Sequence, residues 1–145
     1  MTVRVIRLAH PQDWEAFHRI RRTVLFEARG RYGVYDPDHR DDRHPDNHPL
    51  LFMEDGEPRG TARVDFLGHG RAGVRLVAID MGNQGRGLGR KMMALVERYS
   101  ADRNAMVLEV NSAPEAVGFY ERLGWIMIDP AREQPLLERR FQPPL

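Results

Sequence analysis

A glycine-rich stretch between a predicted strand and a predicted helix is the clearest candidate for chemistry in this chain. Residues 84–89 read Gln-Gly-Arg-Gly-Leu-Gly and follow the largely apolar residues 74–79. The first amides of a helix have no partner within it and lie at the positive end of its dipole, so they bind anions such as phosphates. Glycines let a phosphate approach the main chain without meeting a Cβ. The stretch therefore predicts a phosphate-binding loop.

Two other phosphate-binding motifs fit this chain less well. The Walker loop requires Gly-Lys-Ser/Thr, whereas Gly89 is followed by Arg90. The dinucleotide-binding pattern G-x-G-x-x-G occurs at residues 68–73, ahead of a predicted strand, where it favours a hairpin turn. A kinase or another nucleotide-binding protein is therefore a disfavoured alternative.

The glycine-rich stretch resembles the acetyl-CoA signature of the GCN5-related N-acetyltransferases. That signature is Gln/Arg-x-x-Gly-x-Gly/Ala, and residues 84–89 match it at every fixed position. Residues 108–125 resemble the C-terminal motif of the same family, in the right order and at the family's spacing, while the N-terminal half resembles the family only in its order of elements. The resemblance implies an enzyme that transfers the acetyl group of acetyl-CoA to a primary amine, on a small molecule or a peptide.

The resemblance also implies which residues bind acetyl-CoA. Main-chain amides of the loop would bind the pyrophosphate, and the side chains of Arg86 and Arg90 would add positive charge nearby. Amides of the preceding strand would pair with the pantetheine arm and polarise the carbonyl group. Asn111 would bond to that arm, unless it is simply a turn residue. The predicted cofactor-binding residues are Val77, Ala78, Ile79, Gln84, Gly85, Arg86, Gly87, Leu88, Gly89, Arg90 and Asn111.

Tyr120 is the candidate general acid. The resemblance places the family's tyrosine of this motif near the thioester sulfur, and a phenol with a pKa near ~10 can protonate a departing thiolate. The alternative is a tyrosine that only packs in the core.

The general base is open at the sequence level. Many relatives place a glutamate early in the strand before the loop, but that position falls on Gly73 here. Some use a glutamate in the next strand, which matches Glu109, and partial burial would raise the pKa of such a carboxyl. The remaining alternatives are a water chain, no base at all, or one of the side chains Glu27, His39, His44 and His48.

The Asp- and His-rich residues 35–48 lie where relatives build the acceptor pocket. Their carboxylates would attract a cationic amine, and a solvated loop is the alternative. The spacing of the histidines and aspartates matches no known metal-binding cage, so we expect no metal site.

A catalytically silent acetyl-CoA-binding module, a sensor or a subunit, is the alternative function. The missing early glutamate keeps this alternative open, and the intact Tyr120 argues against it. The motifs contain no nucleophile for a covalent acetyl-enzyme, so direct attack by the amine in a ternary complex is the expected mechanism.

Composition narrows the class of protein. The chain has 145 residues, a net charge of +1 and no cysteine. We expect one domain over residues 1–145, without disulfides or thiolate sites, and no global field that favours nucleic acid or membrane. No signal-peptide core and no apolar run of ~20 residues is visible, so a cytoplasmic protein is expected. A homodimer is suggested by family analogy alone.

Apolar periodicity predicts the elements that position these residues. Val3–Leu8 and Val74–Ile79 read as strands, and the segment from Pro11 to Val24 reads as a helix. A capping box, Ser112 with Glu115, predicts the start of the last helix. Further strands are expected near 50–53, 62–66, 106–110, 125–128 and 136–141, and further helices over 88–99 and 116–123, with an irregular segment over 30–49. The order predicts an α/β, GNAT-like acyl-CoA N-acyltransferase fold, with a mixed, mostly antiparallel central sheet flanked by helices.

Overall fold

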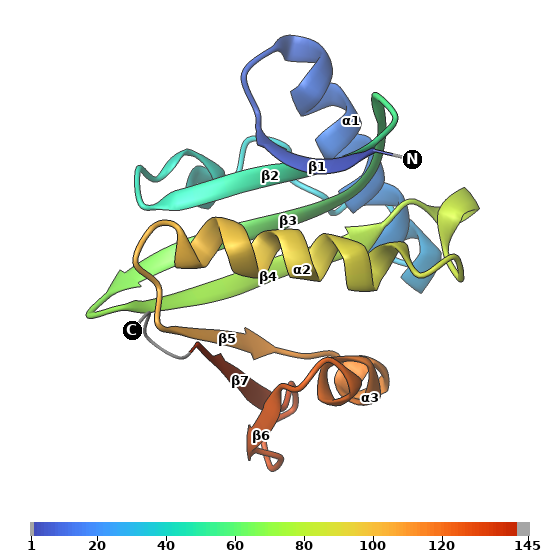
Figure 1. The fold of residues 1–145 in the computed structure, drawn as a ribbon. Helices are drawn as coiled ribbons and strands as arrows, with labels where there is room; N and C mark the ends of the chain where they lie inside the picture. Colours follow the sequence, from blue (N-terminus) through green and yellow to red (C-terminus); the bar gives the residue numbers. More distant parts are fainter. Residues whose placement is uncertain (1, 142–145) are drawn as a thin grey trace.

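The computed structural model describes residues 2–141. Its seven-stranded sheet has the order β1-β2-β3-β4-β5-β7-β6 (Figure 1). Only β4 and β5 run parallel, and the other neighbours are antiparallel. The predicted mixed, mostly antiparallel sheet is thus confirmed. The strands are β1 (Val3–Arg7), β2 (Asn47–Glu54), β3 (Glu57–Gly68), β4 (Arg71–Ile79), β5 (Val107–Asn111), β6 (Ile126–Asp129) and β7 (Leu136–Arg140).

Three α-helices accompany the sheet: α1 (Pro11–Arg21), α2 (Leu88–Ala101) and α3 (Val117–Arg122). A π-helical turn, η1 (Arg22–Phe26), extends α1 directly. The 3-10 turns are η2 (Glu27–Arg29), η3 (Arg40–Arg43), η4 (Met81–Asn83) and η5 (Pro114–Ala116).

Helices α1 and α2 cover opposite faces of the sheet (Figure 1). Successive residues of a strand point to opposite faces, and β2 shows this clearly. Leu50 and Phe52 belong to the core under α2, whereas Leu51 and Met53 belong to the core under α1, with Phe17. The alternation divides the interior into two cores on either side of one sheet.

The pairing between strands β4 and β5 ends about halfway along β4. Their pairing covers Arg71 to Val74 of β4 and stops there. Just beyond, the register between β3 and β4 shifts, and Leu76 has a φ of 53°. A branched residue in this left-handed region is strained, and such strain clusters at functional sites. The bulge turns the second half of β4 away from β5 and leaves a gap between them.

Three local expectations can be compared with the structure. The turn predicted at residues 68–73 is the β3–β4 hairpin, where Gly68 and Gly70 have positive φ. The segment 30–49 is not wholly irregular, because it contains η3 and the start of β2 at Asn47. The prediction of a capping box at Ser112 and Glu115 was wrong. The Ser112 hydroxyl donates to the carbonyl of Ala113 at 2.7 Å, and η5 has no side-chain cap. Ser112 is held at the end of the sheet instead, where its amide donates to the carbonyl of Pro135.

Candidate active site

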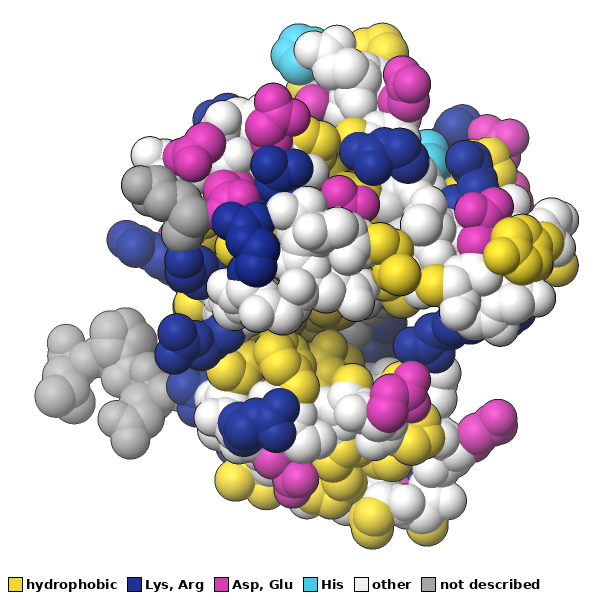
Figure 2. Space-filling model, turned by 90° about the vertical axis from the view of Figure 1, so that its right-hand side faces the viewer, with side chains coloured by type: hydrophobic (Ala, Val, Ile, Leu, Met, Phe, Trp, Pro, Cys, Tyr) yellow, Lys and Arg dark blue, Asp and Glu magenta, His cyan; other side chains and the backbone are white. Residues whose placement is uncertain are grey.

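A cleft of about 630 Å³ opens where β4 and β5 separate. Figure 2 shows the hollow, with hydrophobic side chains inside it and Lys and Arg side chains along its edges. One wall is the second half of β4, and another comes from the end of β5 and from α3. Further lining residues come from α1, η1 and the segment after it, and from Arg63 of β3 and Gln134. The residues that line the cleft are Arg21, Leu25, Phe26, Arg29, Arg31, Val34, Tyr35, Asp36, His39, Asp41, Asp42, Arg63, Val74, Arg75, Leu76, Val77, Val110, Asn111, Ser112, Ala113, Ala116, Tyr120 and Gln134.

The glycine loop joins the end of β4 to the start of α2. Gly85 and Gly87 have φ of 79° and 75°, and Gly87 is the N-cap of α2. The Gln84 side chain closes the loop by donating to the carbonyl of Ile79 at 3.0 Å. Among the described residues, no acceptor is bonded to the main-chain amides from Gly85 to Arg90. The loop therefore presents a row of free N–H groups at a helix N-terminus.

The Arg86 side chain is paired within the protein. Its guanidinium bonds to both oxygens of Glu54 at 3.1 and 3.2 Å and to Asn83 at 2.7 Å. Burial favours the neutral form of Glu54, but hydrogen bonds from Arg86 and Arg59 outweigh it and lower the pKa of the carboxyl. Arg86 therefore holds the glycine loop to β2, and Glu54 compensates its charge.

The three β4 residues that were predicted to bind the cofactor lie in different surroundings in the structure. Val77 lines the cleft, whereas Ala78 packs under α1 and the Ile79 carbonyl is taken by Gln84. Leu88 is buried in the core under α2. Asn111 lines the cleft at the end of β5, with its side-chain oxygen 3.4 Å from Arg132.

Tyr120 lines the cleft from α3 and is only 5% exposed. Its ring packs edge-on against Phe119 and Trp125, with centroids 5.2 and 5.3 Å away. Burial raises the pKa of its phenol to about 12. The residue is thus packed in the core, and its phenol is neutral at the cleft wall.

Glu109 is not among the residues that line the cleft. It lies opposite Gly73 and Glu138 in the sheet, and its negative charge helps to raise the pKa of Arg71. Its neighbours Leu108 and Val110 are buried under α2, so Glu109 belongs to the other face of the sheet. The geometry of the described residues does not place it within the cleft as a general base.

Of the other proposed bases, His39 lines the cleft. The His48 ring nitrogen lies 2.7 Å from the hydroxyl of Tyr99, on α2, and His44 accepts from the amide of Asp46. Neither of them, nor Glu27, is part of the cleft wall.

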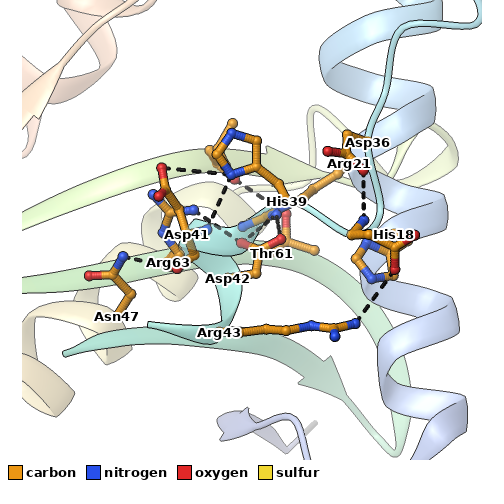
Figure 3. Close-up of polar contacts among 12 residues, drawn as sticks. His18, Arg21, Asp36, His39, Asp41, Asp42, Arg43, Asn47, Thr61 and Arg63 are labelled. Carbon is orange, nitrogen blue, oxygen red and sulfur yellow. Dashed lines mark hydrogen bonds and ion pairs between the residues drawn. The ribbon is translucent and has the colours of Figure 1, made fainter. Parts of the chain in front are cut away.

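The sequence reasoning missed a buried ionic cluster in the cleft wall. Figure 3 shows Arg21 and Arg63 meeting at Asp42. A usable signal was present, because Arg63 and Asp65 alternate with the buried Ala62 and Val64 along a strand. Alternation of this kind is usually read as a solvated face, and here α1 and η3 cover that face.

Tyr35 and His18 form a second contact that the sequence reasoning missed. The Tyr35 hydroxyl lies 2.5 Å from a ring nitrogen of His18. Burial raises the pKa of Tyr35 and, with the charge of Arg21, lowers the pKa of His18, so both are neutral near pH 7. Tyr35 lines the cleft, so the segment after η2 does contribute to the candidate acceptor pocket.

Two negative observations apply to residues 2–141. In this part of the chain, no group of three or more His, Asp or Glu side chains is placed to hold a metal ion. No helix here is both long and apolar enough to cross a bilayer.

Comparisons with known proteins agree with the geometry. The acetyltransferase (GNAT) family matches residues 14–125. A relative from Bacillus subtilis (strain 168), whose name describes an acetyltransferase, is 28% identical to this chain over 121 residues. The match covers 83% of this chain and 82% of that protein. An acyl-CoA N-acyltransferase from Pseudomonas aeruginosa has the same fold, with a TM-score of 0.80, 15% identity and coverage of 95% and 98% of the two chains.

A second solved structure is similar in fold and holds a ligand. The PaiA N-acetyltransferase from Thermoplasma acidophilum, solved in complex with coenzyme A, has a TM-score of 0.75 and 12% identity, and the match covers 97% of this chain and all of that one (100%). At this identity the likeness shows the fold alone. The family match extends over most of the chain, including the glycine loop and Tyr120, so this chain belongs to the acetyltransferase (GNAT) family and is an acetyl-CoA-dependent N-acetyltransferase.

Proposed function

We propose that this enzyme acetylates a primary amine by direct attack of the amine on acetyl-CoA, with both substrates bound in the cleft between β4 and β5. The observation that carries the proposal is that one continuous cleft contains the unpaired half of β4, Tyr120 and the Tyr35–Asp42 segment. Holding both reactants in one cavity turns a bimolecular reaction into an effectively unimolecular one.

The described residues fit acetyl-CoA. A Cβ built on Gly85 or Gly87 would meet nothing within 4 Å, so open space lies over the free amides of the loop. Those amides, from Gly85 to Arg90, would hold the pyrophosphate. Gly89 differs, because its Cβ would lie 3.3 Å from the Phe119 ring, so its small size lets α2 pack on α3. Acetyl-CoA, when bound, supplies the acetyl group as an activated thioester.

The chain's own groups then act on the reacting atoms. The unpaired N–H groups of β4 around Val77 would bond to the pantetheine arm and polarise the carbonyl group. The acceptor nitrogen forms its bond to the carbonyl carbon while the bond to sulfur breaks. Tyr120, still protonated because of its raised pKa, would donate its proton to the sulfur. The ammonium proton would leave through the cleft, where His39 is a titratable group in the wall.

The first experiment is isothermal titration with acetyl-CoA, with CoA and ATP as controls. We expect acetyl-CoA and CoA to bind and ATP to bind much more weakly, since the loop lacks the Lys-Ser/Thr of a Walker motif. Release of free thiol with a panel of amines then measures transfer. Absence of acetyl-CoA binding by the folded protein would overturn the proposal, and binding without transfer to any amine would favour a silent acetyl-CoA-binding module.

A further inference from the structure

Five charged side chains form an alternating chain, and all of them except Asp65 line the cleft. Arg21 donates from Nη1 to both oxygens of Asp42 at 2.9 Å, and Arg63 reaches Asp42 at 3.0 Å. Arg63 also forms a two-point contact with Asp65 at 2.7 and 3.0 Å, and Arg75 lies 3.8 Å from Asp65. We call these five residues, from α1, η3, β3 and β4, the arginine–aspartate chain. Figure 3 shows its Arg21–Asp42–Arg63 part.

The arginine–aspartate chain begins and ends with an arginine, so it carries one more positive than negative charge. All of its members except Arg75 are buried; Arg21 is 2% exposed and Arg63 is 7% exposed. Hydrogen bonds to Asp65 and Asp42 raise the pKa of Arg63 although burial opposes this, so its charge is retained. An uncompensated charge in such a site is costly, and an anion in the cleft would compensate it.

The other charged groups that line the cleft do not remove the excess. Glu109, which lies opposite Gly73 in the sheet, is not part of the cleft wall, and the ion pair that Arg75 forms among the described residues is with Asp65. Five arginines and three aspartates line the cleft. Arg29 pairs with Glu115 at the rim, and Arg31 stacks on the ring of Phe26. Asp41 lies 3.7 Å from the His39 ring, and Asp36 accepts a bond from the amide of the residue two positions later. The expectation that acidic loop residues attract a cationic amine therefore does not suit the inner wall, where the key carboxylate, Asp42, is already bonded to two arginines.

Buried donors without partners lie at the two ends of the arginine–aspartate chain. Among the described residues, nothing accepts from Nε and Nη2 of Arg21 or from Nη1 of Arg75. The Arg21 guanidinium also stacks on Phe17, with its carbon 3.9 Å from the ring centroid, so it is held in place. A buried donor without a partner costs roughly 1–3 kcal/mol, which bonding to a ligand would recover.

Gly73 explains how Arg75 reaches this position. A Cβ at residue 73 would lie 2.5 Å from the Arg75 guanidinium, so only a glycine leaves room for it. This is the position where the family resemblance would put a glutamate in many relatives. This protein thus places the Arg75 guanidinium at a point where those relatives would place a carboxylate.

We propose that the acceptor is a primary amine that also bears a carboxylate, such as a free amino acid or a related small amino acid, and that Arg75 binds this carboxylate. The proposal rests on the proposed function, because it assigns the acceptor of that same cleft. A carboxylate carries the single negative charge that the arginine–aspartate chain lacks, and its two oxygens match the fork of a guanidinium. A phosphate carries close to two charges and fits the balance less well.

The test compares matched acceptors. Thiol release is measured for a set of L-amino acids. Each acid is compared with its amide and with the amine that lacks the carboxyl group, and phosphoethanolamine serves as a phosphate-bearing probe. We expect the acid to exceed its amide in kcat/KM by about 10-fold or more, as loss of a charge-assisted bond predicts. Equal or better use of the amides and simple amines, or a preference for phosphoethanolamine, would overturn the proposal.

Two variants make the assignment specific. Arg75→Gln should remove the preference for the acid, mainly through KM, while the amide is used as before and acetyl-CoA affinity is kept. Arg71→Gln is the matched control: the same change on the same strand, at a residue that bonds to Glu138 outside the cleft. A preference that survives Arg75→Gln, or is lost equally in Arg71→Gln, would contradict the role of Arg75.

A binding measurement separates this proposal from the proposed function. Failure of acetyl-CoA to bind would reject the proposed function itself. A second case is that acetyl-CoA binds while no amine in the panel is acetylated. In that case the shift in the unfolding temperature of the CoA-loaded protein is measured with N-acetylated amino acids and with their amides, to test for the carboxylate site. A larger shift with the acids supports a carboxylate site, and equal shifts overturn it.

Discussion

Tyr120 lies at the boundary between the hydrophobic core and the cleft. Its ring is packed against Trp125, and its side chain is nevertheless part of the cleft wall. Because burial raises the pKa of its phenol to about 12, it holds its proton throughout the neutral range. A phenol that keeps its proton in the neutral range is available to donate it to a sulfur that departs as thiolate.

Tyr120→Phe should therefore lower kcat by about 10²-fold or more, with the Kd of acetyl-CoA nearly unchanged, since only the proton donor is removed. The loss should be similar near pH ~7 and ~9, because the phenol stays protonated at both values. Steady-state thiol release and isothermal titration measure the two quantities. Tyr99→Phe is the control, since that hydroxyl contacts His48 outside the cleft. Full activity of Tyr120→Phe would remove it as the acid.

At the scale of elements, the β4–α2 junction combines two requirements. The chain must turn sharply from a strand into a helix, and its amides must stay free. Gly87 meets both, because its φ of 75° suits a glycine and no side chain covers the N–H groups that follow. The Arg86–Glu54 ion pair then holds this junction to β2.

Gly87→Glu tests the junction directly. A carboxylate there should weaken acetyl-CoA binding by about 100-fold or more, because like charges brought together cost several kcal/mol. Gly56→Glu is a matched control: Gly56 also has a positive φ, 82°, and open space around it, but it lies in the β2–β3 turn. Both variants carry the same backbone strain, so equal affinities in isothermal titration would reject the loop as the pyrophosphate site.

At the scale of the whole molecule, buried carboxylates secure the sheet at two distant places. Glu54, on β2, bonds to Arg59 and Arg86, and Glu138, on β7, bonds to Arg71 and Arg140. Hydrogen bonds from Arg71 lower the pKa of Glu138, and the bonds to Glu54 lower its pKa against the effect of burial.

The lowered pKa values predict how stability depends on pH. A carboxyl whose folded pKa lies below its unfolded value stabilises the fold above the unfolded pKa, about 4.5 here, and this contribution is lost as pH falls through the folded pKa. The free energy of unfolding, measured with urea from neutral to acidic pH, should fall less steeply in the Glu54→Gln, Glu138→Gln double variant than in the unaltered protein. The exposed Glu57→Gln serves as control, and parallel curves for all three would contradict the prediction.

The sequence by itself determined the fold class, the glycine loop and the position of Tyr120. Each depends on residues close together in the chain: the 3.6- and 2-residue apolar periods select helices and strands, and the loop and the tyrosine motif are short, local patterns. The hairpin at residues 68–73 was predictable for the same reason. A local signal can also mislead, as at Ser112, where a tertiary contact with the end of the sheet replaced the expected cap.

Only the tertiary structure decided which side chains face the cleft. Glu109 has the residue type of a general base, but strand register puts it beside Gly73 and Glu138 rather than in the cleft wall. Arg21 and Arg63 lie far apart in the sequence, and they meet at Asp42 because α1 and η3 cover one face of the sheet. Long-range pairing and the bulge at Leu76 shape this site. They arise from the balance of many contacts across the molecule, which no local pattern records.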